Sequence, residues 1–459
     1  TASDGSWAGG KFRTPARLGD RRPLRFGATG DWSQDLAPYP AIRNMAARDL
    51  DALFLLGDSI YADHGSPDQP TIARTLPEFR RKYLESLKPR NGLNTWPEAR
   101  ASTAVFATID DHEVVNDFAG AAATDADPRF ADEKGKLVNQ TAYYREGLQA
   151  FHDYMPLQNE VWPESAEARF AGRPRLYRHR TFGSDAACFL LDARSFRDTP
   201  LNRVFGRDPL GTVNFLFSSA WPGRTMLGRS QVALLQADLL AAQQAGITWK
   251  FVFVPEPIQA LGVIAANDRF EGYAAERAEL LSFVRDKGLT NVVFVTADFH
   301  GTLVNNLVYS WFPLTPSNKL NAWEIITGPV AVEPVLGAGI VAVGAKAGLV
   351  TAQEKAAYDA ANRAGKDLII KGLVDRQLRL QMLDPIGLQD SGIPAALEAG
   401  DYVAVHTFGW TEFEVQGPEL VVTTWGIEAY TDVDLAADPA GIAAREPQVV
   451  SRIRVKAVN

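Results

Sequence analysis

Short hydrophobic runs alternate with longer amphipathic stretches over residues 24–296 of the chain. Each run is five or six residues long, almost wholly apolar, and followed by a polar cluster. Such runs are typical of β-strands that are buried on both faces. The predicted strands span residues 24–29, 52–56, 104–109, 187–191, 249–254 and 291–296.

Between these runs, apolar residues recur every three or four positions. In residues 230–244, Val232, Leu235 and Leu239 fall on one helical face, and Gly246 follows as a stop signal. The same spacing predicts further helices over residues 41–50, 78–87, 140–154 and 273–287. Alternating strands and helices predict an α/β layered fold.

The C-terminal part of the chain has a different pattern. Apolar and polar residues alternate there, which predicts antiparallel strands with one solvated face over residues 402–408, 411–415, 420–427 and 449–458. Residues 330–350 are apolar but interrupted by glycines and a proline, and we expect a loop with a buried segment. We predict a core of residues 1–308 and 401–459, and a helical or loop insertion of residues 309–400 as a candidate lid, helical around 352–364 and 368–383.

Composition and charge exclude several classes of protein. The 459 residues carry a net charge of -8 and contain no Lys/Arg-rich stripe, which argues against nucleic acid as the main partner. No apolar run approaches the ~20 residues of a transmembrane helix. Cys188 is the single cysteine, so no intrachain disulfide is possible. The sequence leaves the oligomeric state open.

Carboxylates follow five of the apolar runs. They are Asp31, Asp58, the Asp110–Asp111 pair, Glu256 and Asp298. Ligand sites of α/β sheets lie beyond the carboxyl ends of the strands, so these groups are expected to converge. Converging carboxylates repel one another, and the site must therefore hold protons or cations. Two metal ions sharing a bridging carboxylate suit displacement at phosphorus, and oxygen-rich ligands favour iron(III), calcium, manganese or magnesium.

Three of the six histidines lie in the same strand-end segments: His64, His112 and His300. His112 stands between two acidic residues, and His300 shares a face with Asp298 on an extended segment, so both are candidates for function. His64 and the neighbouring Asp63 either orient a ligand or lie in solvent. Asp110 is expected to point away from the site if Asp111 points in, since neighbouring side chains of an extended segment face opposite ways.

The strand-end motifs resemble those of a known family. Gly57-Asp58-Ser-Ile-Tyr61, residues 109–116 (Ile-Asp-Asp-His-Glu-Val-Val-Asn) and residues 296–300 (Thr-Ala-Asp-Phe-His) are similar to motifs of PhoD-like metallophosphoesterases, the alkaline phosphatase D family, which is related to purple acid phosphatases. Residues 191–197 and 224–231 match in the same order. The resemblance implies a metallophosphatase-type β-sandwich flanked by helices in α-β-β-α layers, with a helical insertion. Asp31 stands where many family members have cysteine, and Ile109 where they usually have tryptophan.

The resemblance also implies roles for individual residues. Asp58 would bridge two metal ions. Asp31, Tyr61 and His300 would complete an iron(III) site, although on its position alone Tyr61 is either a ligand or a packing residue. A second, divalent ion (calcium, manganese or zinc) would be bound by Asp111 and Asp298, with Glu256 as a further candidate ligand. His112 and Asn116 would contact phosphoryl oxygens or assist the leaving group, and His64 is a candidate substrate contact.

The sequence therefore predicts a metal-dependent phosphoesterase that hydrolyses phosphomonoesters, phosphodiesters or both by attack of a metal-bound hydroxide. Phospholipase D-like and phosphotriester hydrolase activities are alternatives within this chemistry. A secreted calcium-dependent glycan-binding protein is the alternative from another class. The family resemblance implies a periplasmic or secreted location and a small phosphate-ester substrate.

Overall fold

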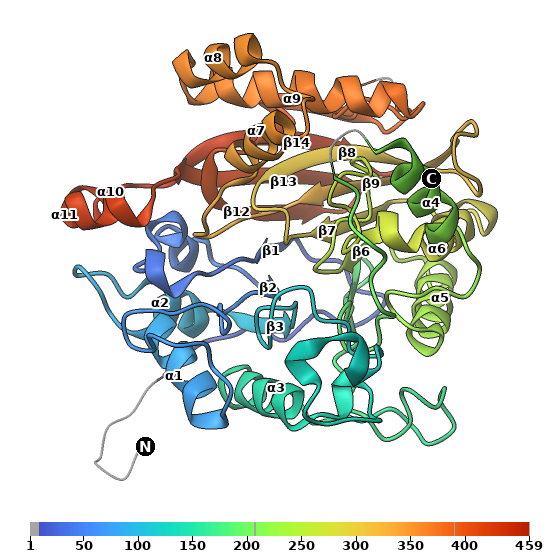
Figure 1. Ribbon diagram of the computed structural model, residues 1–459, viewed down its shortest axis with the longest axis horizontal. Helices are drawn as coiled ribbons and strands as arrows, with labels where there is room; N and C mark the ends of the chain where they lie inside the picture. The colour runs from blue at the N-terminus through green and yellow to red at the C-terminus, as the bar shows by residue number, and fades with distance from the viewer. Residues whose placement is uncertain (1–8, 206–207, 390, 459) are drawn as a thin grey trace.

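The computed structural model describes residues 9–205, 208–389 and 391–458, and it contains two seven-stranded sheets (Figure 1). The first sheet has the order β10-β14-β13-β12-β1-β2-β3 and the second β11-β8-β9-β7-β6-β5-β4. The strands of the first are β1 (Leu24–Thr29), β2 (Ala52–Leu56), β3 (Ala104–Thr108), β10 (Ala395–Ala399), β12 (Thr407–Gln416), β13 (Glu419–Glu428) and β14 (Gln448–Lys456). Those of the second are β4 (Arg178–Phe182), β5 (Ala186–Leu190), β6 (Trp249–Phe253), β7 (Val292–Thr296), β8 (Thr302–Tyr309), β9 (Asn318–Ile326) and β11 (Val403–Ala404).

Each sheet has a parallel part and an antiparallel part. Strands β1, β2 and β3 pair in parallel, as do β5, β6, β7 and β9. The antiparallel strands β12, β13, β14 and β10 extend the first sheet from β1. The parallel strands of one sheet end at the same edge, so the segments that follow them are brought together.

Aromatic side chains join the two sheets face to face. Phe26 of β1 packs edge-on against Phe251 of β6 with ring centroids 4.8 Å apart. Phe54 of β2 stacks on Phe253 of β6 at 3.9 Å. These rings belong to one buried hydrophobic cluster drawn from both sheets. The core of the molecule therefore lies between the sheets.

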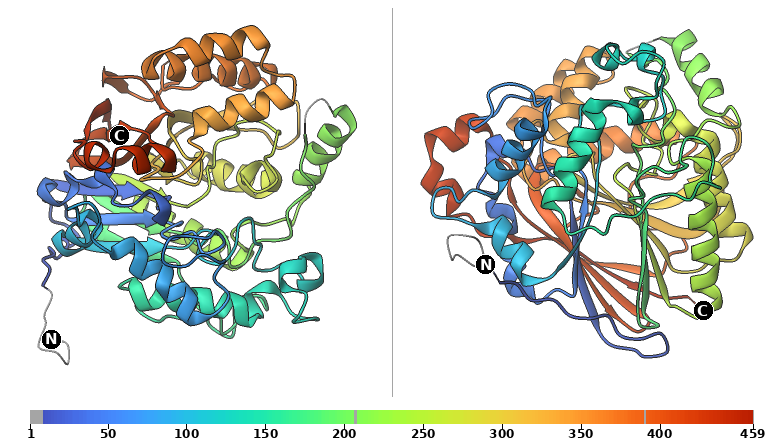
Figure 2. Two further views of the ribbon diagram at one scale, coloured as in Figure 1. Left: turned by 60° about the vertical axis from the view of Figure 1, so that its left-hand side comes forward. Right: turned by 90° about the horizontal axis from the view of Figure 1, so that it is seen from below.

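Helices cover the outer faces of the sandwich (Figures 1 and 2). A second hydrophobic cluster joins β2 to α1 (Leu76–Leu87), α2 (Thr95–Ser102) and α3 (Ala142–Tyr154). A third joins β5, β6 and β7 to α5 (Arg229–Gln244) and α6 (Ala274–Asp286). The remaining helices are α4 (Pro209–Ser219), α7 (Leu336–Lys346), α8 (Ala352–Ala360), α9 (Arg363–Leu380), α10 (Asp432–Ala437) and α11 (Pro439–Ala443). The three clusters confirm the predicted α/β fold of two sheets flanked by helices.

The structure corrects several of the predicted elements. Residues 336–346 form helix α7, although a loop is predicted there. Residues 41–50 form no α-helix; two 3-10 segments, Pro40–Ile42 and Met45–Arg48, take their place, and the left-handed Asp49 ends the second. Strands β12 and β13 are buried over most of both faces rather than half solvated. Residues 318–326 and 395–399 lie within the predicted insertion, yet they form β9 of the second sheet and β10 of the first.

Helices α7, α8 and α9 stand apart from the two outer layers (Figure 1). Their apolar residues, among them Leu336 and Leu373, join the cluster between the sheets beside Leu303 of β8 and Val403 of β11. They therefore cover one end of the sandwich, and their role as a lid stays a prediction. No helix among the described residues is long and apolar enough to cross a membrane.

Candidate metal centre

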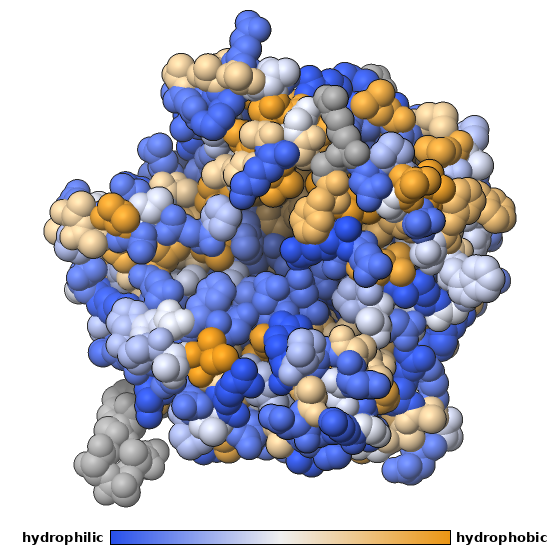
Figure 3. Space-filling model, viewed as in Figure 1, coloured by the Kyte–Doolittle hydropathy of each residue, from blue (hydrophilic) through white to orange (hydrophobic). Residues whose placement is uncertain are grey.

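The strand-end carboxylates meet in one cleft beyond the carboxyl ends of parallel strands from both sheets. Asp31 follows β1, Asp58 follows β2, Asp111 follows β3 and Asp298 follows β7. Figure 3 shows a hydrophilic hollow at the centre of this face of the molecule. The chemistry predicted at separate points of the sequence is thus gathered at the carboxyl ends of strands from both sheets.

Four residues of the cleft adopt left-handed backbone conformations. The φ angles are 62° at Asp31, 51° at Asp58, 61° at Asp298 and 54° at His300. This region costs a non-glycine residue roughly 1–2 kcal/mol. Such strain is maintained only where surrounding contacts enforce it, and it is concentrated at functional sites. It turns each side chain sharply out of its strand and into the cleft.

Ligand atoms of the cleft form overlapping groups in which all atoms lie within 4.8 Å of one another. Asp58 belongs to three of these groups: with Asp31 and His300, with Asp111 and His112, and with Asp110 and Asp298. The hydroxyl oxygen of Tyr61 lies 3.4 Å from Nε2 of His300, beside the first group. The arrangement matches a bridging Asp58 between two ion positions.

Several buried oxygens of the cleft have no hydrogen-bond partner among the described residues. They are both carboxylate oxygens of Asp31, Oδ2 of Asp58 and Oδ1 of Asp111. An unpaired buried carboxylate oxygen carries a large desolvation penalty. The cleft therefore fits cations, and Asp31, Asp58, Tyr61, Asp111, Asp298 and His300 are the residues that would hold them.

Protonation of the cleft supports the same conclusion. Burial first, and then the neighbouring carboxylates, raise the pKa of Asp31, Asp58 and Asp298 well above the ordinary range. Burial and the charges of Asp58 and Asp31 likewise raise the pKa of Tyr61. These groups lose their protons near neutral pH only if positive charge enters the cleft.

The hydrogen bonding and protonation state of His300 suit a metal ligand. Its Nδ1 lies 3.1 Å from the carbonyl oxygen of Pro334, and donation from Nδ1–H leaves Nε2 unprotonated, facing Tyr61 and Asp31. Burial lowers the pKa of His300 to about 4, although 24% of its side chain remains exposed. The neutral imidazole, which is the metal-binding form, therefore prevails at neutral pH.

His112 is oriented by Asp63. Its Nδ1 lies 2.6 Å from Oδ1 of Asp63, whose other oxygen accepts the backbone N–H of Asn116 at 2.9 Å. Burial opposes the charged imidazole, but Asp111 and the hydrogen bond to Asp63 outweigh it and raise the pKa of His112 to about 9. His64 is exposed, and its ring lies 5.4 Å from that of His112. Of the alternatives left open for Asp63, the structure supports the orienting role.

Two buried side chains that the sequence analysis did not single out hold the ligand segments in place. Glu113 accepts hydrogen bonds from the backbone N–H groups of Asp58, Ser59 and Asp110 at 2.7–3.1 Å. Gln34 accepts from the N–H of Tyr61 at 2.9 Å and donates to its carbonyl at 3.1 Å. Their positions after predicted strands are visible in the sequence, but their partners are not.

Glu256 lies in an ion-pair network beside the cleft rather than in a ligand group. Its Oε1 is 2.6 Å from guanidinium nitrogens of both Arg194 and Arg197. Arg194 also contacts Asp110 at 2.6 Å and Asp268 at 2.8 Å. Two guanidinium groups occupy Oε1, whereas Oε2 is buried with no hydrogen-bond partner among the described residues, so the role of Glu256 as a ligand stays a prediction. Asp110, expected to point away, instead lies within 4.8 Å of Asp58 and Asp298.

Comparison with known proteins agrees with this geometry. Residues 28–370 match the sequence model of a family described as PhoD-like phosphatase. The chain belongs to the PhoD-like phosphatase family. Alkaline phosphatase D of Bacillus subtilis (strain 168) is 29% identical in an alignment of 289 positions that covers 59% of this chain and 44% of that protein. This PhoD-like chain thus spans less than half the length of its curated relative.

A solved structure described as that of PhoD has the same fold. It covers 98% of this PhoD-like chain and 74% of its own length, with a TM-score of 0.67 and 20% sequence identity. At this identity the likeness establishes the fold alone. The predicted resemblance to PhoD-like phosphatases is confirmed by the family match, and the roles of individual residues stay predictions.

Proposed function

We propose that the chain is a metal-dependent phosphoesterase that hydrolyses phosphomonoesters, phosphodiesters or both at this cleft. The observation that carries the proposal is the set of buried, unpartnered carboxylate oxygens around Asp58. Membership of a phosphatase family supplies the substrate class. When bound, two ions, iron(III) and a divalent ion of calcium, manganese or zinc, would activate water and neutralise phosphoryl charge.

We assign the residues of the cleft separate roles in binding metal, donating a proton and contacting the substrate. Asp58 would be shared by the two ions. Asp31, Tyr61 and His300 would hold one of them, and Asp111 and Asp298 the other. His112 is held by Asp63 through Nδ1, and its Nε2, which lies 3.9 Å from Oδ1 of Asp111, would donate a proton to the leaving oxygen. Asn116 and His64 lie exposed near His112, where a substrate oxygen would approach.

The histidines of the ligand groups distinguish this function from structural calcium binding. A secreted calcium-dependent glycan-binding protein would need oxygen ligands alone. Here His300 and His112 contribute nitrogens within 4.8 Å of carboxylate oxygens. The phosphoesterase therefore explains more of the site. A periplasmic or secreted location belongs to the same proposal and rests on the family.

Replacing Asp58 by Asn tests the proposal. We expect Asp58→Asn to lose bound metal and hydrolysis of nitrophenyl phosphate esters together, because Asn supplies one neutral ligand oxygen where a charged bridge is required. Elemental analysis and an absorption spectrum would be measured beside activity, with a visible tyrosinate band expected if Tyr61 binds iron(III). A panel of mono-, di- and triesters then identifies the ester class.

Matched measurements make the outcome decisive. Asp238→Asn changes an aspartate of α5 whose side chain is 25% exposed and which belongs to none of the ligand groups, and this variant should keep both metal and activity. Chelation of the wild-type protein should abolish hydrolysis, and added metal should restore it. Full activity of Asp58→Asn without metal, or calcium alone with no hydrolysis of any ester, would contradict the proposal.

A further inference from the structure

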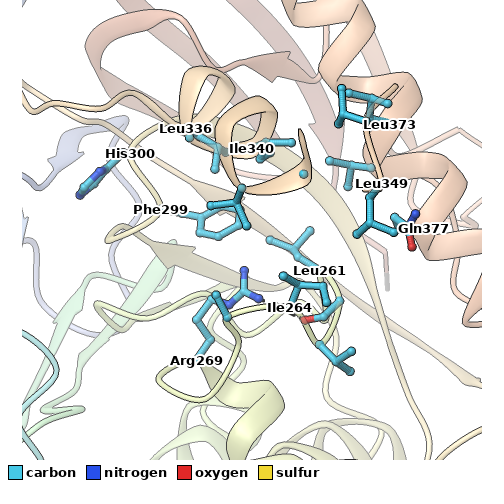
Figure 4. Close-up of a pocket in the computed structure, with 18 of the residues that line it drawn as sticks. Leu261, Ile264, Arg269, Phe299, His300, Leu336, Ile340, Leu349, Leu373 and Gln377 are labelled. Atoms are coloured by element: carbon cyan, nitrogen blue, oxygen red, sulfur yellow. Dashed lines mark hydrogen bonds between the residues drawn. The ribbon is translucent and has the colours of Figure 1, made fainter. Parts of the chain in front are cut away.

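An apolar cavity of about 570 Å³ adjoins the metal centre. Its walls are the loop of residues 261–265, Phe299, and helices α7 and α9 with the segment after α7. Figure 4 shows His300 at one end, Phe299 in the middle, and leucine and isoleucine side chains beyond it. Asp298 and His300 line this cavity as well as belonging to the ligand groups, so it begins where the candidate metal centre ends.

The cavity keeps apolar surface exposed to solvent. Leu261, Ile264, Phe299, Ile340 and Leu349 all line it, and each is only partly buried. They come from segments far apart in the sequence, so the fold and not one local pattern gathers them. Hydrating such concave apolar surface is unfavourable, and a cavity of this size and lining is typical of a small-molecule site. Figure 3 shows hydrophobic residues along the upper rim of the hydrophilic hollow.

Arg269 adds a polar group to this apolar wall. Its guanidinium lies 4.9 Å from the centre of the Phe299 ring, and Nη2 donates to the carbonyl of Gly262 at 3.1 Å. Its Nε is buried and has no hydrogen-bond partner among the described residues, and only 8% of the residue is exposed. Nη2 also lies 3.4 Å from Oε1 of the buried Glu271, so the chain itself neutralises this cation. An oxygen-bearing end of a ligand would therefore lie at the metal centre, and its apolar end along this wall.

We propose that this cavity binds the apolar substituent of the substrate, so that the preferred ester is an amphiphilic phosphodiester with an alkyl chain on its non-leaving oxygen. The inference rests on the proposed phosphoesterase function. A phosphoryl group at the metal centre would direct its second ester substituent past His300 and Phe299 into the cavity. The alkyl chain would cover the exposed apolar side chains.

The test uses methyl, butyl and octyl diesters of p-nitrophenyl phosphate at concentrations below micelle formation. The leaving group and the phosphorus centre are the same in all three, so only the substituent varies. We expect kcat/KM to rise with chain length, by up to about fourfold for each methylene that becomes buried. Diacyl glycerophosphodiesters in vesicles form a second arm: their hydrolysis indicates a membrane source, and hydrolysis of the monomeric esters alone indicates a soluble one.

A glycine pair provides the variant and its control. Gly339 of α7 lines the cavity, and a Cβ there would meet only Pro334 Cγ at 4.0 Å, so Gly339→Leu fills the cavity without disturbing the fold. We expect the octyl-to-methyl ratio of kcat/KM to fall at least tenfold. Gly372 of α9 is exposed, lies outside the cavity lining and has no atom near its Cβ position, so Gly372→Leu should keep the wild-type ratio.

A binding measurement separates this inference from the proposed function. Octylphosphonate should displace a fluorescent apolar dye from the wild-type holoprotein, and methylphosphonate should not. Equal kcat/KM for methyl and octyl esters, or an unchanged ratio in Gly339→Leu, overturns the cavity inference while the phosphoesterase stands. If no ester is hydrolysed but octylphosphonate displaces dye from the wild type and not from Gly339→Leu, the phosphoesterase is wrong and the ligand class of the cavity is upheld.

Discussion

Asp58 joins the candidate ligand groups, and Glu113 determines where Asp58 stands. Both carboxylate oxygens of Glu113 accept backbone N–H groups, those of Asp58 and Asp110 on one oxygen and that of Ser59 on the other. These bonds stabilise the left-handed turn that aims Asp58 into the cleft. A residue of this kind acts on metal binding without touching the metal.

We therefore expect Glu113→Gln to weaken metal binding about 10- to 100-fold while the fold is kept, because the amide nitrogen faces an N–H group where an oxygen accepted one. Metal affinity would be measured by competition with a chelator, and the fold by circular dichroism. Glu78→Gln is the matched control, since Glu78 accepts backbone N–H groups in the same way at the exposed start of α1. Equal metal affinities of Glu113→Gln and the wild type would show that the turn at Asp58 keeps its conformation without the Glu113 hydrogen bonds.

The sequence points to the candidate ligands more clearly than to the residues that hold them in place. Asp31, Asp58, Asp111, Asp298 and His300 follow buried strands, and strand ends converge in any layered α/β fold, so position alone points to them. The supporting contacts join segments that no local pattern links. Arg194, for instance, pairs with Asp110, Asp111, Glu256 and Asp268, which only the packed structure brings together. The same network explains why Glu256, equivalent in sequence to the other strand-end carboxylates, has other partners.

At the scale of elements, His406 contacts all three of the helices α7, α8 and α9, which cover one end of the sandwich. His406 lies between β11 and β12. Its Nδ1 is 2.7 Å from Oδ1 of Asp367 on α9, and its Nε2 is 2.6 Å from the hydroxyl of Tyr358 on α8. A Cβ at Gly337 of α7 would fall 2.2 Å from the His406 ring, so that helix packs closely on it as well. His406 thus connects all three helices to the sheet.

Replacing His406 by Ala should release these helices while the core stays folded. Asp367 and Tyr358 would lose a buried partner, at a cost of about 1–3 kcal/mol for each group left unpaired. We expect amide hydrogen exchange in residues 336–380 to accelerate by tenfold or more, with little change in the strands between the sheets. His179→Ala on β4 is the control and should leave exchange in residues 336–380 unchanged. Faster exchange throughout the molecule would mean that His406 supports the whole core instead.

The glycines of α7 show why that helix was not predicted. Gly337, Gly339 and Gly344 lower helix propensity, and they interrupt an otherwise apolar run. In the folded chain, a Cβ at Gly337 would clash with the His406 ring, and a Cβ at Gly344 would fall 2.6 Å from the Val350 side chain, so packing requires glycine at both positions. Tertiary contacts therefore override the local preference. The parallel strands were predicted because full burial of a short run leaves a plain pattern in the sequence.

At the scale of the molecule, the outer layer on the second sheet depends on a buried carboxylate. Glu276 of α6 accepts the backbone N–H groups of Met226 and Leu227, both at 2.9 Å, and the hydroxyl of Thr225, which ties the start of α5 to α6. Burial raises the pKa of Glu276 from 4.5 to about 7, despite these hydrogen bonds. The folded protein therefore binds this proton more tightly than the unfolded chain does.

The sign of the resulting pH dependence follows from linkage. Because the folded-state pKa lies above the unfolded value, the contribution of Glu276 to stability is complete below pH ~4.5 and is lost as pH rises through ~7. A shift of this size corresponds to on the order of 3 kcal/mol. Glu276→Gln resembles the protonated side chain and does not titrate. The unfolding free energy of the variant should therefore rise relative to that of the wild type between pH ~4.5 and ~7.

The measurement is the difference in unfolding free energy between wild type and Glu276→Gln, from denaturant titrations at pH 4.5 to 8. Carboxylates of the metal centre protonate in the same range, but they do so in both proteins and cancel from the difference. We expect the difference to grow in favour of the variant between pH 4.5 and 7 and then to level off. A difference that stays constant with pH would mean that Glu276 is ionised in the folded state throughout, and that its three donors outweigh its burial.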